Sequence, residues 1–549
     1  MVLSIKDLPA LAEQGVSIPQ YDRSQITAGV VHIGPSNFAR GHLFKYFDQV
    51  LKQDPQWGVR AISLKSNKEK KPLSQLAREF VQTAILPMAR FQKPALPARH
   101  KPTRKEILKN QDYLYTVNEQ SVDGTQRSVI GSLMDVTEVS EDPKGALDVL
   151  CDPNIKLVTI TVTQAGYGHD PQTGNLDFER DDIKECLSRM DMPSTTVGYL
   201  VAALERRMKE SAPPLTIMSC DNMEANGTIL RQVVTTYATQ KSSKLRKYIE
   251  ENITFPSTMV DRIVPTTTNK DIFNSKAAGL DDEWPIMTED FWQWVIENDF
   301  AGDMPDLESV GATVTSNVEP FELMKLRMLN GAHMALGCVA GLNGHTLVDK
   351  AMKNPKLKEF IQNFMHETAT TVPPIEGIDF AEYQQRLIER LENPEMSDQL
   401  VRLARNGTGK VDTRFANPLK DAKAAGADYQ HLAFATAAWI QYLKGYDDKG
   451  NLIGENIKDD SGTPLGINDK KAVESGLQDM ARKSNGNPQP VMTASGLFDA
   501  DLMKDQEFIK DVSRHLRNIQ EHGVVEAINA ISLTVVTQPS KIPATQPAP

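Results

Sequence analysis

Two patterns of apolar residues divide the chain near residue 310. Before that point, short apolar runs rich in β-branched residues alternate with segments of helical periodicity. The runs are AGVVHI (28–33), GVRAISLKS (58–66), IKLVTITVT (155–163) and LTIMSC (215–220). Unbroken apolar runs of this length are typical of parallel strands that are buried on both faces. Their alternation with helical segments, such as 196–210, predicts a doubly wound α/β domain over residues 1–310.

The remainder of the chain has an almost entirely helical pattern. Apolar residues recur at helical spacing in 321–342, 355–372, 379–393, 397–407, 429–446 and 505–523. We therefore predict a mostly α-helical domain over residues 311–535. The Pro-rich end, 536–549, is expected to be a disordered tail.

Composition and charge narrow the class of protein. The 549 residues are 40% hydrophobic and 24% charged, as in soluble globular proteins. A net charge of −11 argues against a nucleic-acid partner, and no apolar run is long enough to span a membrane. The start of the chain does not have the pattern of a signal peptide. Four widely spaced cysteines show neither metal-binding nor disulfide spacing, so we expect reduced thiols and a cytoplasmic protein.

One segment departs from this acidic composition. Residues 66–110 contain eleven Lys or Arg, three acids and five prolines. A solvated insertion is the simpler interpretation. A role near cofactor phosphates or against a partner is the alternative.

The turn after the first predicted strand resembles a nucleotide-binding turn. In VHIGPSNFARGH (31–42), Gly34 occupies the first glycine position of the G-x-G-x-x-G pattern, Ser36 the second and Ala39 the third. A glycine there permits a tight turn before a helix whose N–H groups face an anion. Alone, the pattern also fits an ordinary strand–helix turn. The next strand is followed by basic residues, with no acid before Glu69, so the choice between NAD and NADP stays open.

The segment FELMKLRMLNGAHMALG (321–337) combines an apolar helix with four polar residues. On an ideal helix of about 100° per residue, Glu322, Lys325, Asn330 and His333 project from one flank. Such a flank cannot pack against apolar side chains, because buried polar groups need partners. A surface Glu–Lys pair would satisfy the pattern. The alternative is a lysine whose pKa is lowered by burial so that it acts as a base, with Asn as an oxyanion donor.

Several motifs together resemble one family. They are VHIGPSNFARGH (31–42), TVTQAGY (161–167), MSCDNMEANG (218–227), FPSTMVDRIVP (255–265), FWQWVIENDF (291–300), KLRMLNGAH (325–333) and RLARNGTGK (402–410). Over roughly residues 20–540 the chain is similar to the mannitol dehydrogenase family of long-chain polyol dehydrogenases and hexuronate reductases.

The resemblance implies a Rossmann-type domain followed by a helical domain, with the active site in the cleft between them. It implies metal-independent hydride transfer between NAD, or NADP, and a polyol–ketose pair of the mannitol/fructose type. The enzyme would be a monomer or a small homo-oligomer.

Residue roles follow from the same resemblance. Lys325 would be the general acid/base, Asn222 and Asn330 would polarise the substrate oxygen, His333 would bond to the reacting hydroxyl, and Glu322 would help Lys325 exchange its proton. The implied substrate-binding residues are Asp261, Arg402 and Lys410. The implied cofactor-binding residues are Gly34, Ser36, Asn37, Phe38 and Arg40.

Three departures from the family pattern leave alternatives open. They are Ser36 in place of glycine, Gln164 in place of glutamate, and Asn298 in place of aspartate. Ser36 and Gln164 motivate a non-catalytic sugar or dinucleotide sensor, whereas Lys325 argues against it. A hexuronate reductase for fructuronate or tagaturonate is the other alternative, because Arg402 and Lys410 could also hold a carboxylate. The short-chain dehydrogenase pattern Y-x-x-x-K also occurs, as YATQK (237–241).

Overall fold

A computed structural model describes residues 2–64, 102–170, 173–190, 192–396, 398–454 and 466–531. The chain forms two compact units, unit 1 (Met1–Glu322) and unit 2 (Leu323–Pro549). The change of unit falls within α12 (Glu319–Met324), later than residue 310. Residues just after 310 remain with unit 1 because β12 (Thr313–Thr315) pairs with β11 (Gln293–Glu297).

Unit 1 is built on a parallel sheet of six strands. Their order is β5-β2-β1-β6-β7-β8. From β1 the chain adds β2 and β5 on one side and then β6, β7 and β8 on the other, so the strand order reverses between β1 and β6. This is the strand order of a Rossmann-type fold. The strands are β1 (Ala28–Ile33), β2 (Gly58–Ser63), β5 (Leu133–Glu138), β6 (Leu157–Ile160), β7 (Leu215–Ser219) and β8 (Ile253–Thr254). The four strands predicted from apolar runs are confirmed. β5 and β8 were not predicted, because β5 contains several polar residues and β8 is only two residues long.

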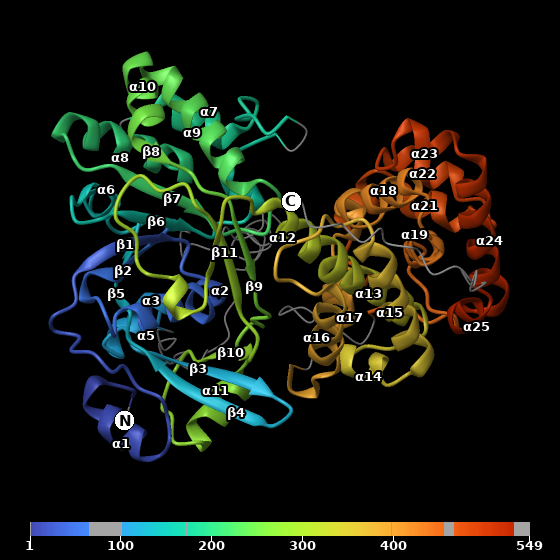
Figure 1. Ribbon diagram of the computed structural model, residues 1–549, viewed down its shortest axis with the longest axis horizontal. Helices are drawn as coiled ribbons and strands as arrows, with labels where there is room; N and C mark the ends of the chain where they lie inside the picture. The colour runs from blue at the N-terminus through green and yellow to red at the C-terminus, as the bar shows by residue number, and fades with distance from the viewer. Residues whose placement is uncertain are drawn as a thin grey trace, which may run out of the picture. The chain divides into compact units, whose positions relative to one another are not determined.

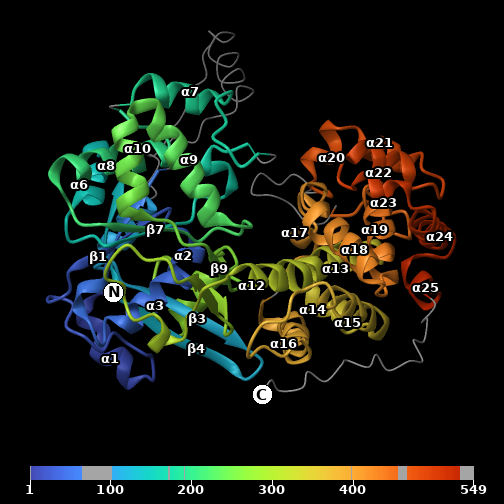
Figure 2. The same ribbon diagram turned by 45° about the horizontal axis from the view of Figure 1, so that its top comes forward.

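Apolar side chains cover both faces of this sheet, as continuous apolar strands require. Val31 and Ile33 of β1 pack into one core with a layer of helices, which Figures 1 and 2 show along the sheet. Those helices are α6 (Pro143–Cys151), α7 (Asp181–Ser188), α8 (Thr196–Glu210), α9 (Asn226–Lys241) and α10 (Ser243–Asn252). Val30, whose side chain points the other way, packs into a second core with α3 (Leu43–Val50).

Two small sheets complete the second face. One has the order β10-β3-β4 and the other β12-β11-β9, and their apolar residues share the core of α3. Their further strands are β3 (Tyr115–Ser121), β4 (Gly124–Ile130), β9 (Thr258–Asp261) and β10 (Ile286–Glu289). The sequence patterns did not predict these strands, which mix apolar and polar residues. The other helices of unit 1 are α1 (Leu8–Glu13), α2 (Asn37–Gly41), α5 (Arg104–Asn110) and α11 (Asn269–Ala277).

Unit 2 is helical, as predicted. Its core contains α13 (Gly331–Leu342) and α19 (Gln430–Tyr442), which pack on each other and are buried nearly all round. Small residues, mostly Gly and Ala, allow this close packing. Around them lie α14 (Val348–Met352), α15 (Pro355–Ala369), α16 (Phe380–Glu392), α17 (Leu400–Leu403), α18 (Asn417–Ala425), α20 (Lys470–Glu474), α21 (Leu477–Arg482), α22 (Gln489–Ser495), α23 (Ala500–Lys504), α24 (Gln506–His522) and α25 (Val524–Asn529).

Two π-helices interrupt the α-helical pattern of unit 2. The first, η5 (Lys325–Asn330), joins α12 to α13 in one continuous helical segment. The second, η8 (Asp412–Ala416), leads into α18 and packs against η5. Helices with i→i+5 bonds are rare and are frequent at functional sites. The two π-helices therefore indicate a candidate functional region of unit 2.

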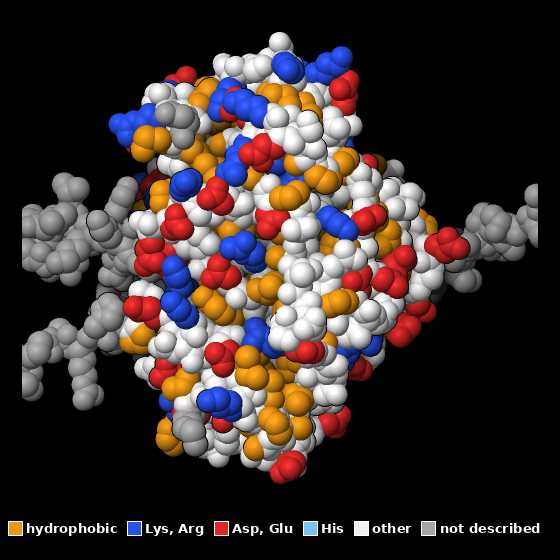
Figure 3. Space-filling view, turned by 90° about the vertical axis from the view of Figure 1, so that its left-hand side faces the viewer, with side chains coloured by type: hydrophobic (Ala, Val, Ile, Leu, Met, Phe, Trp, Pro, Cys, Tyr) orange, Lys and Arg blue, Asp and Glu red, His pale blue; other side chains and the backbone are white. Residues whose placement is uncertain are grey.

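Some sequence predictions concern residues outside the described ranges. These are residues 66–101 of the basic segment, the basic residues directly after β2, and the tail 536–549. The four cysteines are buried and form no disulfide. Among the described helices, none is long and apolar enough to cross a membrane. The face of the molecule in Figure 3 carries acidic and basic side chains interspersed with small apolar groups.

Candidate active site

The topological switch point of the sheet is formed by the ends of β1 and β6. Gly34 follows β1 with a φ of +93°, and a Cβ added there would lie 2.2 Å from the carbonyl oxygen of Thr161. Only glycine combines this backbone conformation with so close an approach. Ligands of open α/β sheets bind in the crevice at such a point, outside the carboxyl ends of the strands. The turn that the sequence singled out therefore lies where this fold binds nucleotides.

Buried polar contacts hold the two strand ends together beneath this turn. His32 is fully buried and bonds through Nδ1 to Thr159 Oγ1 (2.8 Å) and through Nε2 to Thr161 Oγ1 (3.0 Å). Thr161 donates its hydroxyl to the Gly34 carbonyl (2.8 Å). Burial lowers the pKa of His32 to about 4, so the ring is neutral at physiological pH. The backbone of the turn is thus fixed from within.

The predicted cofactor-binding residues after Gly34 have distinct environments. Ser36 is the N-cap of α2 and its hydroxyl accepts a bond from Ala39 N (3.2 Å). Asn37 donates to the carbonyl of Pro265 (3.3 Å) and to the hydroxyl of Thr267 (3.1 Å). Serine is a favoured N-cap residue, which explains how it can replace the family glycine without disrupting the helix start.

Phe38 and Arg40 face inward from the same turn. Phe38 stacks on His42 with ring centroids 4.9 Å apart. Arg40 is 0% exposed, lies 3.3 Å over the Trp284 ring and donates to the side-chain oxygen of Asn37 (3.2 Å). Burial lowers the pKa of Arg40 to about 9, partly offset by Tyr115 and Asp282. Its side chain supports the turn through Asn37.

A carboxylate that the sequence analysis did not single out organises the end of β6. Asp221 accepts bonds from Val162 N (2.9 Å), Thr163 N (2.9 Å) and the Tyr167 hydroxyl (2.7 Å). Thr163 has a φ of +68°, which is a strained conformation for a β-branched residue. In the sequence, the motif MSCDN places Asp221 directly before Asn222, and this adjacency is the one feature that could have indicated a role for Asp221.

Asn222 lies in an exposed loop that is attached to several parts of unit 1. Asn226 donates to the Asp221 carbonyl (3.1 Å) and to the Thr258 carbonyl of β9 (2.8 Å). Asp261, 3% exposed, is the last residue of β9. Glu322, which is buried, accepts a bond from Ala225 N in the same loop (3.2 Å).

These contacts bring together three of the predicted positions. The loop of Asn222 is hydrogen-bonded to the strand of Asp261 and to the carboxylate of Glu322. Gln164, exposed at the start of η3 (Gln164–Tyr167), lies in the segment that Asp221 holds.

In unit 2, the helix with the polar flank differs from the ideal geometry assumed for it. Lys325 begins the π-helix η5 and Asn330 ends it, so a uniform 100° projection does not apply between them. Because a π-helix bonds residue i to residue i+5, it brings residues five apart onto the same side. The π-turn therefore aligns Lys325 and Asn330 more closely than an α-helix would. Lys325 is 4% exposed, whereas Asn330 and His333 are partly exposed.

The predicted substrate-binding residues of unit 2 belong to a group of cations. Arg402 is paired with Asp398 through Nε (2.7 Å), and Lys410 donates to the Arg405 carbonyl (2.8 Å). Burial, and then the charge of Arg414, lower the pKa of Lys410 to about 8. Its ammonium group is therefore partly neutral just above physiological pH.

Arg414 is a member of this group that the sequence analysis missed. It lies in η8, and its buried Nε has no hydrogen-bond partner among the described residues. Burial lowers its pKa to about 10, and Asp412 offsets this only in part. The spacing of basic residues in RLARNGTGKVDTR was the available signal.

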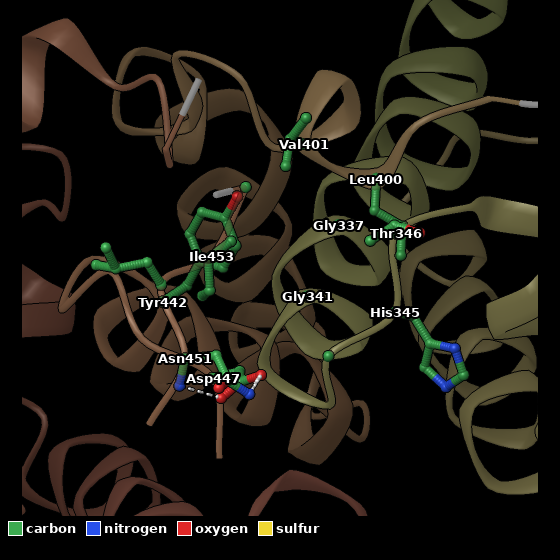
Figure 4. A pocket seen from close by; sticks show the side chains of 13 residues that line it. Gly337, Gly341, His345, Thr346, Leu400, Val401, Tyr442, Asp447, Asn451 and Ile453 are labelled. Atoms are coloured by element: carbon green, nitrogen blue, oxygen red, sulfur yellow. Dashed lines mark hydrogen bonds between the residues drawn. The ribbon is translucent and has the colours of Figure 1, made fainter. Parts of the chain in front are cut away.

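Two other candidate sites, a cavity in unit 2 and the YATQK segment of unit 1, contain none of the predicted site residues. A cavity of about 300 Å³ lies beside the C-terminal half of α13, lined in part by Gly341, Tyr442 and the bonded pair Asp447–Asn451, and none of the predicted site residues lines it (Figure 4). In the YATQK segment, the Tyr237 hydroxyl is buried against the Cys186 carbonyl (3.1 Å). This tyrosine is part of the core, which argues against short-chain dehydrogenase chemistry.

Comparisons with known proteins agree with the fold. The family model described as the mannitol dehydrogenase Rossmann domain matches residues 98–309, and that of the mannitol dehydrogenase C-terminal domain matches residues 317–520. Mannitol 2-dehydrogenase of Aspergillus clavatus is 32% identical, with 96% of this chain and 97% of the relative covered. The Pyricularia oryzae protein of the same name is also 32% identical, with 95% and 96% covered.

Solved structures are similar over the same length. Pseudomonas fluorescens mannitol 2-dehydrogenase, in a ternary complex with NAD and D-mannitol, has a TM-score of 0.78 at 28% identity, covering 96% of this chain and 99% of that one. A D-sorbitol dehydrogenase in substrate-free form also has a TM-score of 0.78, at 30% identity, covering 96% and 100%.

The Rossmann-type unit followed by a helical unit defines an oxidoreductase of two domains. The chain belongs to the mannitol dehydrogenase family.

Proposed function

We propose that this protein is a metal-independent NAD-dependent polyol dehydrogenase that interconverts a polyol and a ketose of the mannitol/fructose type. The names of its relatives and the NAD and D-mannitol of one similar structure support the reaction class. The observation that carries the proposal is the buried lysine at the start of a π-helix, with Asn330 one π-turn later.

The residues at the switch point fit a dinucleotide. The close approach of Gly34 to Thr161 leaves no room for a side chain, and hydrogen bonds from below fix the turn. Bound NAD would supply a hydride acceptor for alcohol oxidation and a hydride donor for ketone reduction. Gly34, Ser36 and Asn37 would hold it, with Phe38 and Arg40 supporting the turn. NADP stays possible, because the residues directly after β2 lie outside the described ranges.

The side chains of the site supply proton transfer and charge stabilisation. In alcohol oxidation, neutral Lys325 takes the proton of the reacting hydroxyl; in ketone reduction, its ammonium form returns a proton to the oxygen. Asn222 and Asn330 donate hydrogen bonds to that oxygen as negative charge develops on it, and His333 holds the hydroxyl in line. Glu322, buried three residues before Lys325, exchanges the proton with solvent.

The far end of the substrate is assigned to Asp261, Arg402 and Lys410. An open-chain polyol presents hydroxyls that both donate and accept, so a carboxylate and two cations can each bond to it. The pairing of Arg402 with Asp398 orients its guanidinium.

The test is a panel of cofactors and substrates. The purified protein is offered NADH or NADPH with D-fructose, D-fructuronate or D-tagaturonate, and oxidation of the cofactor is followed by its near-ultraviolet absorbance. Turnover of D-fructose with NADH is expected. Saturable dinucleotide binding without turnover of any ketose would instead favour a non-catalytic sugar or dinucleotide sensor.

One observation favours a second candidate function, a hexuronate reductase. The charge of Arg414 helps to lower the pKa of Lys410, and neither cation has a carboxylate partner among the hydrogen bonds and ion pairs of the described residues. Asp469 and Asp412 offset the burial of Lys410 and Arg414 only in part, and the carboxylate of a uronate would pair with these cations directly. Preference for D-fructuronate or D-tagaturonate over D-fructose in the panel would select this candidate.

A further inference from the structure

We propose that Asp221 is a positioning residue that sets the location of Asn222 by tying together the backbone that follows β6 and the backbone that follows β7, beside the switch-point crevice. This inference rests on the proposed role of Asn222 as a hydrogen-bond donor to the reacting oxygen. Asp221 itself does not touch the reacting atoms in this assignment.

The carboxylate of Asp221 accepts three hydrogen bonds from one segment. Oδ1 accepts from Thr163 N (2.9 Å), and Oδ2 accepts from Val162 N (2.9 Å) and from the Tyr167 hydroxyl (2.7 Å). Tyr167 is fully buried, and its hydroxyl also bonds to Ser219 Oγ (2.6 Å) at the end of β7. Two successive backbone N–H groups and a buried phenol therefore converge on one side chain.

The segment that Asp221 holds is not in a relaxed conformation. Thr163 has φ +68° and ψ 158°, a region that a β-branched residue rarely adopts. The hydrogen bond from Thr163 N to the Asp221 carboxylate stabilises this conformation. A strained residue that hydrogen bonds hold in place beside a ligand crevice is the pattern expected of a pre-organised site.

The chain after Asp221 is fixed at a second point. The Asp221 carbonyl accepts bonds from Met223 N (2.9 Å) and from the Asn226 side chain (3.1 Å). Asn222 therefore lies between a residue anchored through its carboxylate and a turn anchored through Asn226. Movement of Asp221 would be transmitted directly to the backbone of Asn222.

An amide cannot replace this carboxylate. In Asp221→Asn, one oxygen becomes an NH₂ group, which cannot accept a bond from an N–H. In either amide orientation at least one of the N–H groups of Val162 and Thr163 then faces a donor. The substitution therefore disturbs the loop while changing the side-chain volume very little.

The experiment is a double-mutant cycle between Asp221→Asn and Asn222→Ala. We expect Asp221→Asn alone to lower kcat about 100-fold, because misplacement of a catalytic group by about 1 Å costs that much. In the Asn222→Ala background the same change should lower kcat by less than about threefold, because the side chain it positions is gone. Dinucleotide affinity and the melting temperature are measured for all four proteins.

Two further variants separate positioning from folding. Asp22→Asn replaces an exposed aspartate of unit 1 that also accepts bonds from a nearby backbone N–H and hydroxyl, and it should leave kcat unchanged. Tyr167→Phe removes one of the three bonds to Asp221 and is combined with Asn222→Ala in the same way if Asp221→Asn does not fold.

The outcomes distinguish the two claims. Multiplicative losses in the cycle, run with Asp221→Asn or, if that variant does not fold, with Tyr167→Phe, would overturn the positioning role while leaving the proposed reaction intact. An Asn222→Ala variant with normal kcat would refute the role of Asn222 in the proposed function, and the positioning role with it. A strong loss for Asp221→Asn that disappears without the Asn222 side chain would support both.

Discussion

Replacing Gly34 with alanine tests the turn at the switch point. The new Cβ would lie 2.2 Å from the Thr161 carbonyl oxygen and 3.0 Å from its carbon, whereas ordinary contacts begin at 3.4 Å. These two atoms belong to the backbone directly after β6, so the turn must move by about 1 Å, because close-packed backbone cannot yield. The φ of +93° adds strain that glycine does not feel.

The cost of this substitution can be estimated from its two parts. Left-handed backbone costs about 1–2 kcal/mol for a residue with a Cβ. Forcing an added methyl group into packed surroundings costs about 1–3 kcal/mol. The free energy of unfolding of unit 1 should fall by about 2–5 kcal/mol, which corresponds to a fall of at least about 3 °C in melting temperature for a unit of this size.

Thermal unfolding and NADH titration measure the two consequences. Because a shifted turn no longer matches the dinucleotide, we expect at least about tenfold weaker binding, equivalent to about 1.4 kcal/mol. Gly302→Ala is the matched control, since a Cβ there meets nothing within 4 Å and its φ is not left-handed. A Gly34→Ala protein that melts and binds NADH as the wild type does would refute the assignment of this turn.

Three further predictions concern other side chains. Lys410 has a pKa of about 8, so its positive charge is present below that pH and lost above it. KM for the substrate should therefore rise between about pH 7 and 9. Lys410→Arg should abolish this rise, because arginine keeps its charge. Arg414→Met should raise KM for a uronate more than KM for D-fructose, and equal effects would remove the case for an anionic substrate. Tyr237→Phe should leave kcat within about twofold of the wild type, since its buried hydroxyl bonds only within the core and the loss of one such bond affects stability instead, by about 1 kcal/mol.

The central sheet could be predicted because its strands are buried on both faces. β1, β2, β6 and β7 lie in runs that are mostly apolar and β-branched, which is the pattern of buried parallel strands. β5 reads LMDVTE, in which the polar residues Asp135, Thr137 and Glu138 interrupt the apolar ones, so it lacked that signal. The strands of the two small sheets lacked it as well, because polar residues such as Asn118, Asp261 and Glu289 interrupt their apolar ones.

The sequence indicated candidate site residues but not the contacts that support them. Lys325, Asn330 and His333 follow from a polar flank on an apolar helix, but no pattern announced the π-helix between Lys325 and Asn330. A π-turn depends on tertiary packing, here against η8, rather than on local propensity. The bonds of Asp221 to residues about sixty positions earlier were equally inaccessible, because they exist only once β6 and β7 are side by side.

Lys325 is the residue on which the proposed chemistry depends. The most direct test compares NADH oxidation with D-fructose by the wild type, Lys325→Ala and Lys325→Arg. We expect both variants to bind NADH normally and to lose about 10³-fold or more in kcat, because neither side chain can exchange a proton near neutral pH. Turnover by either variant within about tenfold of the wild type would contradict a lysine acid/base and, with it, this account of the active site.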